Sequence, residues 1–246
     1  MGLFLTLACL FFVGSVAGWV IELLFRRFIS SSNPERKWIN PGFCTGPYLP
    51  LYGCGLCVLY LIAGTEALIP ISSMVWNKLI LFLIMAVSMT VIEYIAGIIS
   101  LKVTKVRLWD YSREWGNLQG IICPKFSLIW ALLGAYYYFL IHPHILGLLE
   151  WFSESELSAF FIGVFFGVFT IDVIHSTQLI VKLKKYAEEN DVIVRYEAIK
   201  AHIRSRYDET RERYPFFRPF RSDRPLSEHL KELIDSFENR RQKIKK

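Results

Sequence analysis

Five long apolar segments constrain the fold of this 246-residue chain more than any other feature. Most of them reach the roughly 20 residues that a helix needs to cross a hydrocarbon core of about 30 Å. The segments are residues 3–25, 47–63, 79–101, 118–141 and 159–181. They predict an all-α fold, a polytopic membrane helix bundle with about five transmembrane helices.

Lysine and arginine are distributed unevenly among the connections between these segments. The first and third connections carry four basic residues each, the second carries one, Lys78, and the fourth carries none. Because short cytoplasmic loops retain lysine and arginine, this alternation predicts an outside N-terminus and an inside C-terminus. We expect a multi-pass protein of the cell membrane.

The C-terminal tail holds the net positive charge of the chain. From residue 182 onward there are 18 basic and 12 acidic residues, which accounts for the whole net charge of +6. We therefore expect a transmembrane domain at 1–182 and a cytoplasmic basic helical tail at 183–246. Such a tail suits anionic lipids of the inner leaflet better than nucleic acid. Its apolar helix faces could instead pack together or bind a partner subunit.

Two parts of the sequence resemble each other. A Val-Ile-Glu triplet ends at Glu22 and again at Glu93, and a tryptophan follows sixteen residues later in both places, at Trp38 and Trp109. A cluster of glycine and proline then precedes the next apolar segment. The pattern predicts a parallel internal repeat, as in one class of transporters. Chance similarity between apolar sequences is the alternative.

The glycine and proline clusters predict irregular backbone at the inner ends of the second and fourth segments. Irregular backbone at membrane depth survives only where it is buried in protein or lines a wet cavity. We therefore expect backbone ligands for a substrate in these loops, although proline can also simply open a helix. The candidate positions are Gly42, Gly46, Pro47, Pro50, Gly120 and Pro124.

Five ionisable side chains lie within the apolar segments, where burial costs at least a few kcal/mol each. We expect all five to meet around one hydrated pocket in the cytoplasmic half. Glu22 and Glu93 would contact a charged group or cation, and Lys125 would be their counter-ion. Asp172 and His175, three residues apart on one helix face, would contact substrate or relay protons.

A purely structural role is the alternative for these groups. Lys125 could do no more than neutralise one carboxylate, and Glu22 could lie at the membrane interface beside Arg26 and Arg27. The chain lacks the sequence motifs of P-loop nucleotide sites, zinc proteases and serine hydrolases. We therefore expect neither a cofactor nor a bound metal ion, and any ATP-driven step would need a separate chain.

Several motifs between residues 14 and 134 resemble a known family. They are Gly18-Trp19-Val20-Ile21-Glu22, Asn40-Pro41-Gly42-Phe43, Gly46-Pro47-Tyr48-Leu49-Pro50, Ile92-Glu93-Tyr94, Leu108-Trp109-Asp110-Tyr111-Ser112 and Lys125-Phe126-Ser127. In their order and residue types these motifs resemble the bacterial membrane family labelled putative ABC transporter permease (type IV). The resemblance implies a permease-like membrane protein that works with an ATP-binding partner. It assigns no catalytic residues.

Three functions remain open at this stage. The favoured one is a membrane permease or permease subunit, in which Glu93→Gln or Lys125→Ala abolishes function without preventing insertion. A membrane sensor or scaffold would act through the tail. An intramembrane enzyme, which we favour less, would act on lipid or peptide with Trp109-Asp110-Tyr111-Ser112 and the same carboxylates as its catalytic groups.

Overall fold

The computed structural model describes residues 2–30, 33–66, 69–70, 73–154, 156–209, 217, 222 and 224–244. Side chains at 150–151, 153–154, 156, 207–209 and 237–244 are not part of this description. Helices dominate the described parts, and the two strands there are only two residues long. The all-α membrane bundle predicted from the sequence is therefore confirmed.

Within the described residues, four helical segments are long and apolar enough to cross a membrane. They are Leu3–Phe28, Met74–Thr104, Pro124–Leu149 and Leu157–Glu189. The first is α1 and the second is α3. The third combines α4 (Pro124–Tyr136), the π-helical turn η2 (Tyr137–Ile141) and the first part of α5 (His142–Glu154), and the fourth lies within α6 (Glu156–Glu189).

The second predicted span is shorter than expected. Its helix, α2, covers only Pro50–Ala63, which at 1.5 Å per residue is about 21 Å and less than the hydrocarbon core. Proline at the start of α2 and the glycine and proline residues before it prevent helix formation further back. The chain returns across the bundle through irregular backbone and α2 together.

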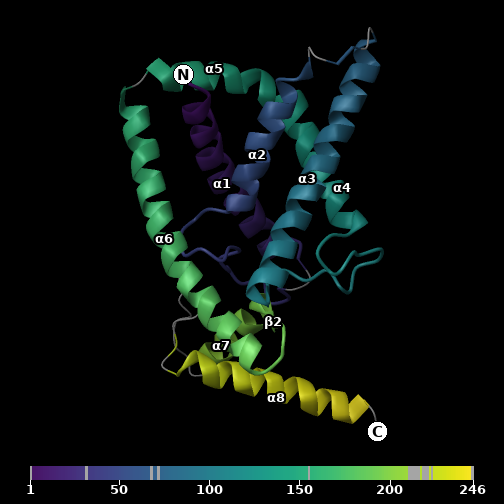
Figure 1. The fold of residues 1–246 in the computed structure, drawn as a ribbon, viewed down its shortest axis with the longest axis vertical. Helices are drawn as coiled ribbons and strands as arrows, with labels where there is room; N and C mark the ends of the chain where they lie inside the picture. Colours follow the sequence, from purple (N-terminus) through teal and green to yellow (C-terminus); the bar gives the residue numbers. More distant parts are fainter. Residues whose placement is uncertain are drawn as a thin grey trace.

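Figure 1 shows the order in which the chain traverses the bundle. The N-terminus, the connection between α2 and α3, and α5 lie at one end, which we call the neutral end. The loops after α1 and α3 and the C-terminal tail lie at the other end, which we call the basic end. All the basic-rich connections therefore share one end, as the predicted orientation requires. Which end faces the cell interior stays a prediction.

Small residues allow α1 and α2 to pack closely. Gly14 and Gly18 lie on α1 in the G-x-x-x-G spacing that brings membrane helices together. A Cβ at Gly18 would lie only 2.2 Å from the ring of Tyr52 on α2. The missing side chain at Gly18 therefore makes room for Tyr52 against α1.

The last membrane helix continues into the tail without interruption. Helix α6 passes through the predicted boundary between residues 182 and 183 and ends at Glu189. The following strand β2 (Val194–Arg195) pairs in parallel with β1 (Val106–Arg107), the strand after α3. The tail is thus joined to the loop between α3 and α4 by backbone hydrogen bonds as well as by side chains.

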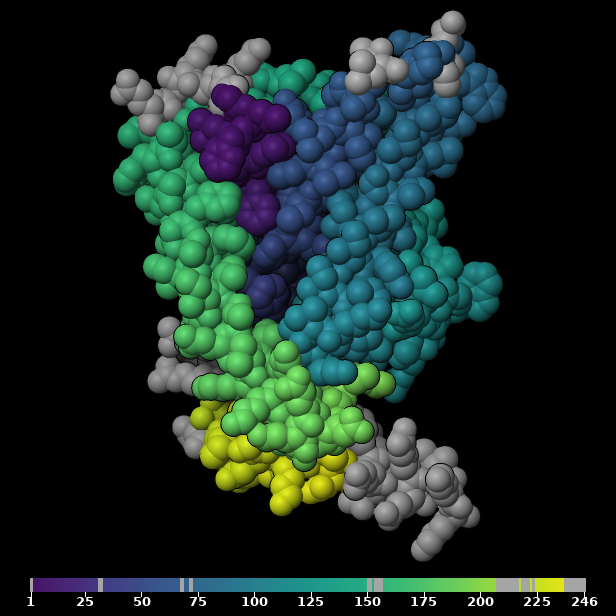
Figure 2. Space-filling model, in the orientation of Figure 1, coloured from purple at the N-terminus to yellow at the C-terminus, as the bar shows by residue number. Residues whose placement is uncertain are grey.

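Helices α7 (Tyr196–Glu209) and α8 (Leu226–Ile244) lie at the basic end. Figure 2 shows α8, in yellow, below the green end of α6. A second apolar core fixes them there, separate from the core between the membrane helices. Its buried members are Val106, Leu183, Ala187, Val194, Tyr196, Ile199, Ile203 and Leu230.

The two units of the predicted repeat share their architecture. Each consists of a long helix, a loop and a helix that opens with proline, at Pro50 in the first unit and Pro124 in the second. In each unit a tyrosine hydroxyl reaches the glutamate of the long helix, Tyr52 to Glu22 and Tyr111 to Glu93. The common origin of the two units stays a prediction.

Candidate functional site

Glu93 is the most deeply buried carboxylate in the part of the chain that the structure describes. It projects from α3 and is 2% exposed. The hydroxyl of Tyr111 donates to its Oε1 at 3.1 Å, whereas no described residue donates to its Oε2 with the geometry of a normal hydrogen bond. None of the ion pairs between described residues includes Glu93. The site therefore holds a buried carboxyl group without a counter-ion in the described part of the chain.

Aromatic rings enclose this carboxyl group. Tyr111 stacks on Phe126 of α4, with ring centroids 4.3 Å apart and planes 10° from parallel. Trp130, one turn further along α4, is buried and lies against Glu93. Because aromatic rings displace water from around the carboxylate, its interactions with any ionic partner are strengthened.

Glu22 lies in the same network but has a cation beside it. Its Oε1 accepts from Nε of Arg26 at 2.9 Å, one turn along α1, and its Oε2 accepts from the hydroxyl of Tyr52 at 3.2 Å. The ring of Tyr52 packs on Trp130, with centroids 4.8 Å apart. Glu22 and Glu93 are thus connected through Tyr52 and Trp130, and their charges repel each other.

Arg26 connects this network to the tail. Its Nη1 donates to Glu197 of α7 at 2.8 Å, across 171 residues of sequence. Lys200, 2% exposed, donates to the same carboxylate at 3.3 Å and to the carbonyl oxygen of Asn40 at 2.9 Å. Burial disfavours the charged form of Glu197, but Arg26 and Lys200 outweigh it and hold the pKa of Glu197 below its usual value.

A second ionic contact joins the tail to the loop after α3. Asp110 accepts from Arg107 at 3.2 Å and pairs with Arg195 of β2 at 3.2 Å. Burial opposes ionisation of Asp110, but hydrogen bonds from Ser112 and the two arginines lower the pKa of its carboxyl group. Helix α1 and the loop after α3 are therefore held to the tail at the basic end by carboxylates that stay ionised near neutral pH.

Asp172 is engaged elsewhere, by the irregular segment before α2. Its Oδ1 accepts from the backbone N–H of Thr45 at 3.0 Å and its Oδ2 from that of Gly46 at 2.7 Å. The hydroxyl of Tyr48 donates to Oδ2, and that of Ser176 donates to Oδ1 at 3.1 Å. With four donors around it, the carboxylate fixes this segment to α6.

The expected pairing of Asp172 with His175 is not found. The partner on the next turn is Ser176 instead, and the side chain of His175 is exposed. The carboxylate of Asp172 accepts from the loop amides instead. A relay between these two side chains has no support in the geometry.

The expected role of Lys125 as counter-ion is also corrected. Its ammonium group pairs with Glu114 at 3.0 Å, and its side chain is 60% exposed. The reason is that α4 begins at Pro124, not at residue 118, because Gly116, Gln119 and Gly120 have positive φ angles. Lys125 is therefore in the first turn of α4, at the edge of the bundle.

The expected backbone ligands are occupied by the chain itself. The N–H of Gly42 donates to Asn40, that of Gly46 to Asp172 and that of Gly120 to Asn117, at 3.3, 2.7 and 3.0 Å. Pro50 and Pro124 each open a helix, the alternative considered for them, and Pro47 has no N–H to offer. These loops serve to position side chains.

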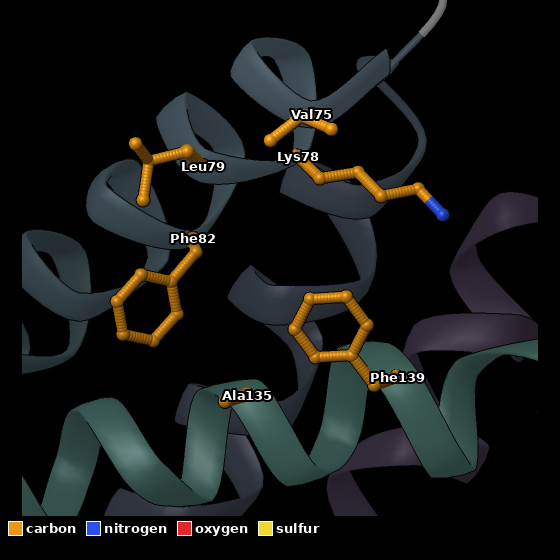
Figure 3. A pocket seen from close by; sticks show the side chains of 6 residues that line it. All are labelled: Val75, Lys78, Leu79, Phe82, Ala135 and Phe139. Carbon is orange, nitrogen blue, oxygen red and sulfur yellow. The ribbon is translucent and has the colours of Figure 1, made fainter.

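An open groove of about 460 Å³ lies between α3 and the helix formed by α4 and η2. Figure 3 shows it between the rings of Phe82 and Phe139, with the ammonium group of Lys78 pointing away. Its other lining residues are Val75, Leu79 and Ala135. None of the expected site residues lines this groove.

Sequence reasoning therefore found Glu22 and Glu93 but missed most of their partners. Arg26 was considered beside Glu22, and the spacing of four residues supports that contact. No sequence spacing indicates the contacts of Tyr52, Trp130 and Glu197, because each of these residues lies on a different helix. A buried carboxylate in an apolar helix could have prompted a search for tyrosine and tryptophan donors.

The comparisons with known proteins agree with this architecture. No curated protein matches the chain, and no solved structure matches it. One family does match, over residues 9–177, a region that runs from the first turns of α1 into α6 and includes Glu22, Glu93 and Asp172. Since this match covers more than half of the chain, the protein belongs to the family described as putative ABC-transporter type IV.

Proposed function

We propose that this chain is the membrane-embedded permease subunit of a transporter that works with a separate ATP-binding protein. The family match and the four membrane-spanning segments support a membrane permease. The absence of a P-loop motif from the sequence supports a division of labour, in which nucleotide hydrolysis belongs to another chain.

The observation that carries the proposal is the carboxyl group of Glu93. An ionisable group inside a membrane domain is costly and marks a pathway for ions or substrate by default. Glu22 is paired with Arg26, whereas Glu93 is 2% exposed and has no cation beside it among the residues that the structure describes. Glu93 is therefore the group that would bind a proton, a metal cation or a positively charged part of a substrate.

The network also gives the site a connection to the basic end. From Glu93 it runs through Trp130 and Tyr52 to Glu22 and Arg26, and from there to the tail. A partner that moves the tail would shift Arg26 and so change the charge balance near Glu93. The basic tail would at the same time contact anionic lipids of the inner leaflet.

The test is a reconstituted complex. The tagged chain, purified from its native host in mild detergent, should bring a P-loop protein in stoichiometric amount, and the pair should hydrolyse ATP in nanodiscs. Glu93→Gln should alter that hydrolysis, whereas the matched variant Glu114→Gln, at the rim, should not. An intact chain that purifies without any P-loop protein and shows no ATP hydrolysis would contradict the proposal.

A sensor or scaffold remains the second candidate, because the tail shares a core with the loops of the basic end and forms ion pairs with α1 and the loop after α3. In that case deletion of residues 190–246 would abolish function while Glu93→Gln would be harmless. If Glu93 belongs to a permease site, Glu93→Gln should abolish function.

A further inference from the structure

Two histidines and a glutamate converge between α7 and α8, outside the membrane-spanning helices. His202 lies on α7, whereas His229 and Glu232 lie three residues apart on one face of α8. The two imidazole rings are 5.5 Å apart between centroids, and Nε2 of His202 lies 3.3 Å from Oε2 of Glu232. One ligand atom from each of the three residues lies within 4.8 Å of the other two.

Each of the two histidines has a buried ring nitrogen that makes no hydrogen bond of normal geometry with the described residues. His229 is 2% exposed, and its Nε2 lies 2.8 Å from the hydroxyl of Ser222. Its Nδ1 is buried without a hydrogen bond to any described residue, and the 3.3 Å contact of His202 Nε2 with Glu232 lacks the geometry of one. Buried polar atoms are nearly always satisfied by protein, water or an ion, so two such nitrogens beside one carboxylate point to a missing ligand.

The geometry points to a divalent metal site formed by His202, His229 and Glu232. Two imidazoles and one carboxylate are a donor set that zinc favours, with a water molecule in the fourth position. In a tetrahedral zinc site with bonds of about 2.0–2.1 Å, ligand atoms lie about 3.4 Å apart. Small side-chain rotations would therefore close the site. The bound ion fixes α8 against α7 and thereby orders the tail.

Two arginines compete with the ion for Glu232. Arg206 of α7 donates to Oε2 at 3.0 Å, and Arg224 donates to Oε1 at 3.2 Å. Oε2 is the oxygen next to His202, so a metal ion bound there displaces Arg206. Removal of Arg206 should therefore tighten metal binding, whereas removal of a metal ligand should weaken it.

The experiment is a metal titration of the full chain, purified in detergent with its affinity tag removed. Co²⁺ should bind at one equivalent, with the visible absorption of a tetrahedral site and without the intense ultraviolet band of a thiolate ligand. Zn²⁺ should displace it. His202→Gln and Glu232→Gln should each weaken binding at least tenfold, and Arg206→Gln should strengthen it. His175→Gln, on α6, is the matched control and should bind as the wild type does.

A second measurement uses only the wild-type chain, so that misfolding of a variant cannot affect it. Hydrogen exchange of α8 should slow when Zn²⁺ is added to the wild-type chain and return to its original rate with chelator. No binding to the wild type, or equal binding by both ligand variants, would overturn the site. Neither result affects the proposed role of Glu93, which lies in a different part of the molecule.

Discussion

The hydroxyl of Tyr111, in the loop between α3 and α4, donates to the carboxylate of Glu93 on α3 at 3.1 Å. The indole of Trp130 on α4 is a second donor beside this buried carboxyl group. The loop thereby controls one oxygen of Glu93. The following predictions test this arrangement and the contacts that support it.

The Tyr111→Phe substitution should destabilise the protein, because it removes a hydrogen bond from the buried carboxylate of Glu93. The expected loss is about 1–3 kcal/mol, the cost of an unsatisfied buried polar group. Glu93→Gln should leave stability unchanged or raise it, since a neutral amide replaces an unpaired carboxylate. Thermal unfolding in detergent measures both effects. Tyr94→Phe, nearby on α3, is the control and should change stability by less than about 0.5 kcal/mol.

The Gly18→Leu substitution should separate α1 from α2. A Cβ at this position would already lie 2.2 Å from the Tyr52 ring, so the side chain of leucine forces the helices apart. We expect a loss of about 1–3 kcal/mol, as for other overpacked interiors. Gly163→Ala on α6, where a Cβ meets nothing within 4 Å, should be neutral or slightly stabilising. Equal stability of both variants would contradict the close contact.

The Asp172→Asn substitution should loosen the segment before α2. An amide has one acceptor oxygen, so it cannot satisfy the N–H groups of Thr45 and Gly46 and the hydroxyl of Tyr48 together. Hydrogen exchange at residues 45–48 should become faster, while exchange within α3 stays the same. His175→Gln should leave the segment protected. Faster exchange in the His175 variant would instead indicate that His175 interacts with Asp172.

Acid should release the tail from the inner loops. The pKa values of Asp110 and Glu197 are lowered in the folded protein, so their stabilising effect is complete above the ordinary carboxyl pKa and disappears as pH falls through the lowered values. The distance between spin labels at Val103 and Lys231 should stay constant from pH 8 to about 5 and broaden below about 4. A label pair at Val75 and Val103, both on α3, is the control. Release near pH 6 would contradict the assignment to these carboxylates.

The sequence predicted the bundle well because its signals are local. Apolar segments and basic loops follow directly from the need to satisfy backbone groups and to keep lysine and arginine on one side. The depth of Lys125 was misjudged because the estimate assumed a helix from residue 118. Because the helix begins six residues later, at Pro124, Lys125 lies about 9 Å closer to the rim of the bundle than expected.

Contacts between segments far apart in the sequence could not be predicted from local sequence patterns. The ion pair of Arg26 with Glu197 joins the first helix to the tail, and nothing in the local sequence of either residue indicates the other. The same holds for three of the four donors around Asp172, which come from a loop 124 to 127 residues earlier. An ionisable residue was recognisable as important, but its neighbours depend on how the helices pack.

The most direct measurement of the central claim compares Glu93→Gln with Lys125→Ala in a strain that lacks the chromosomal gene. Both variants should insert at the wild-type level. The structure predicts that Glu93→Gln fails to restore the function lost on deletion. Lys125→Ala should restore it, because its exposed pair with Glu114 contributes only about 0–1 kcal/mol. Full restoration by Glu93→Gln would contradict the assignment of this carboxyl group to the transport site.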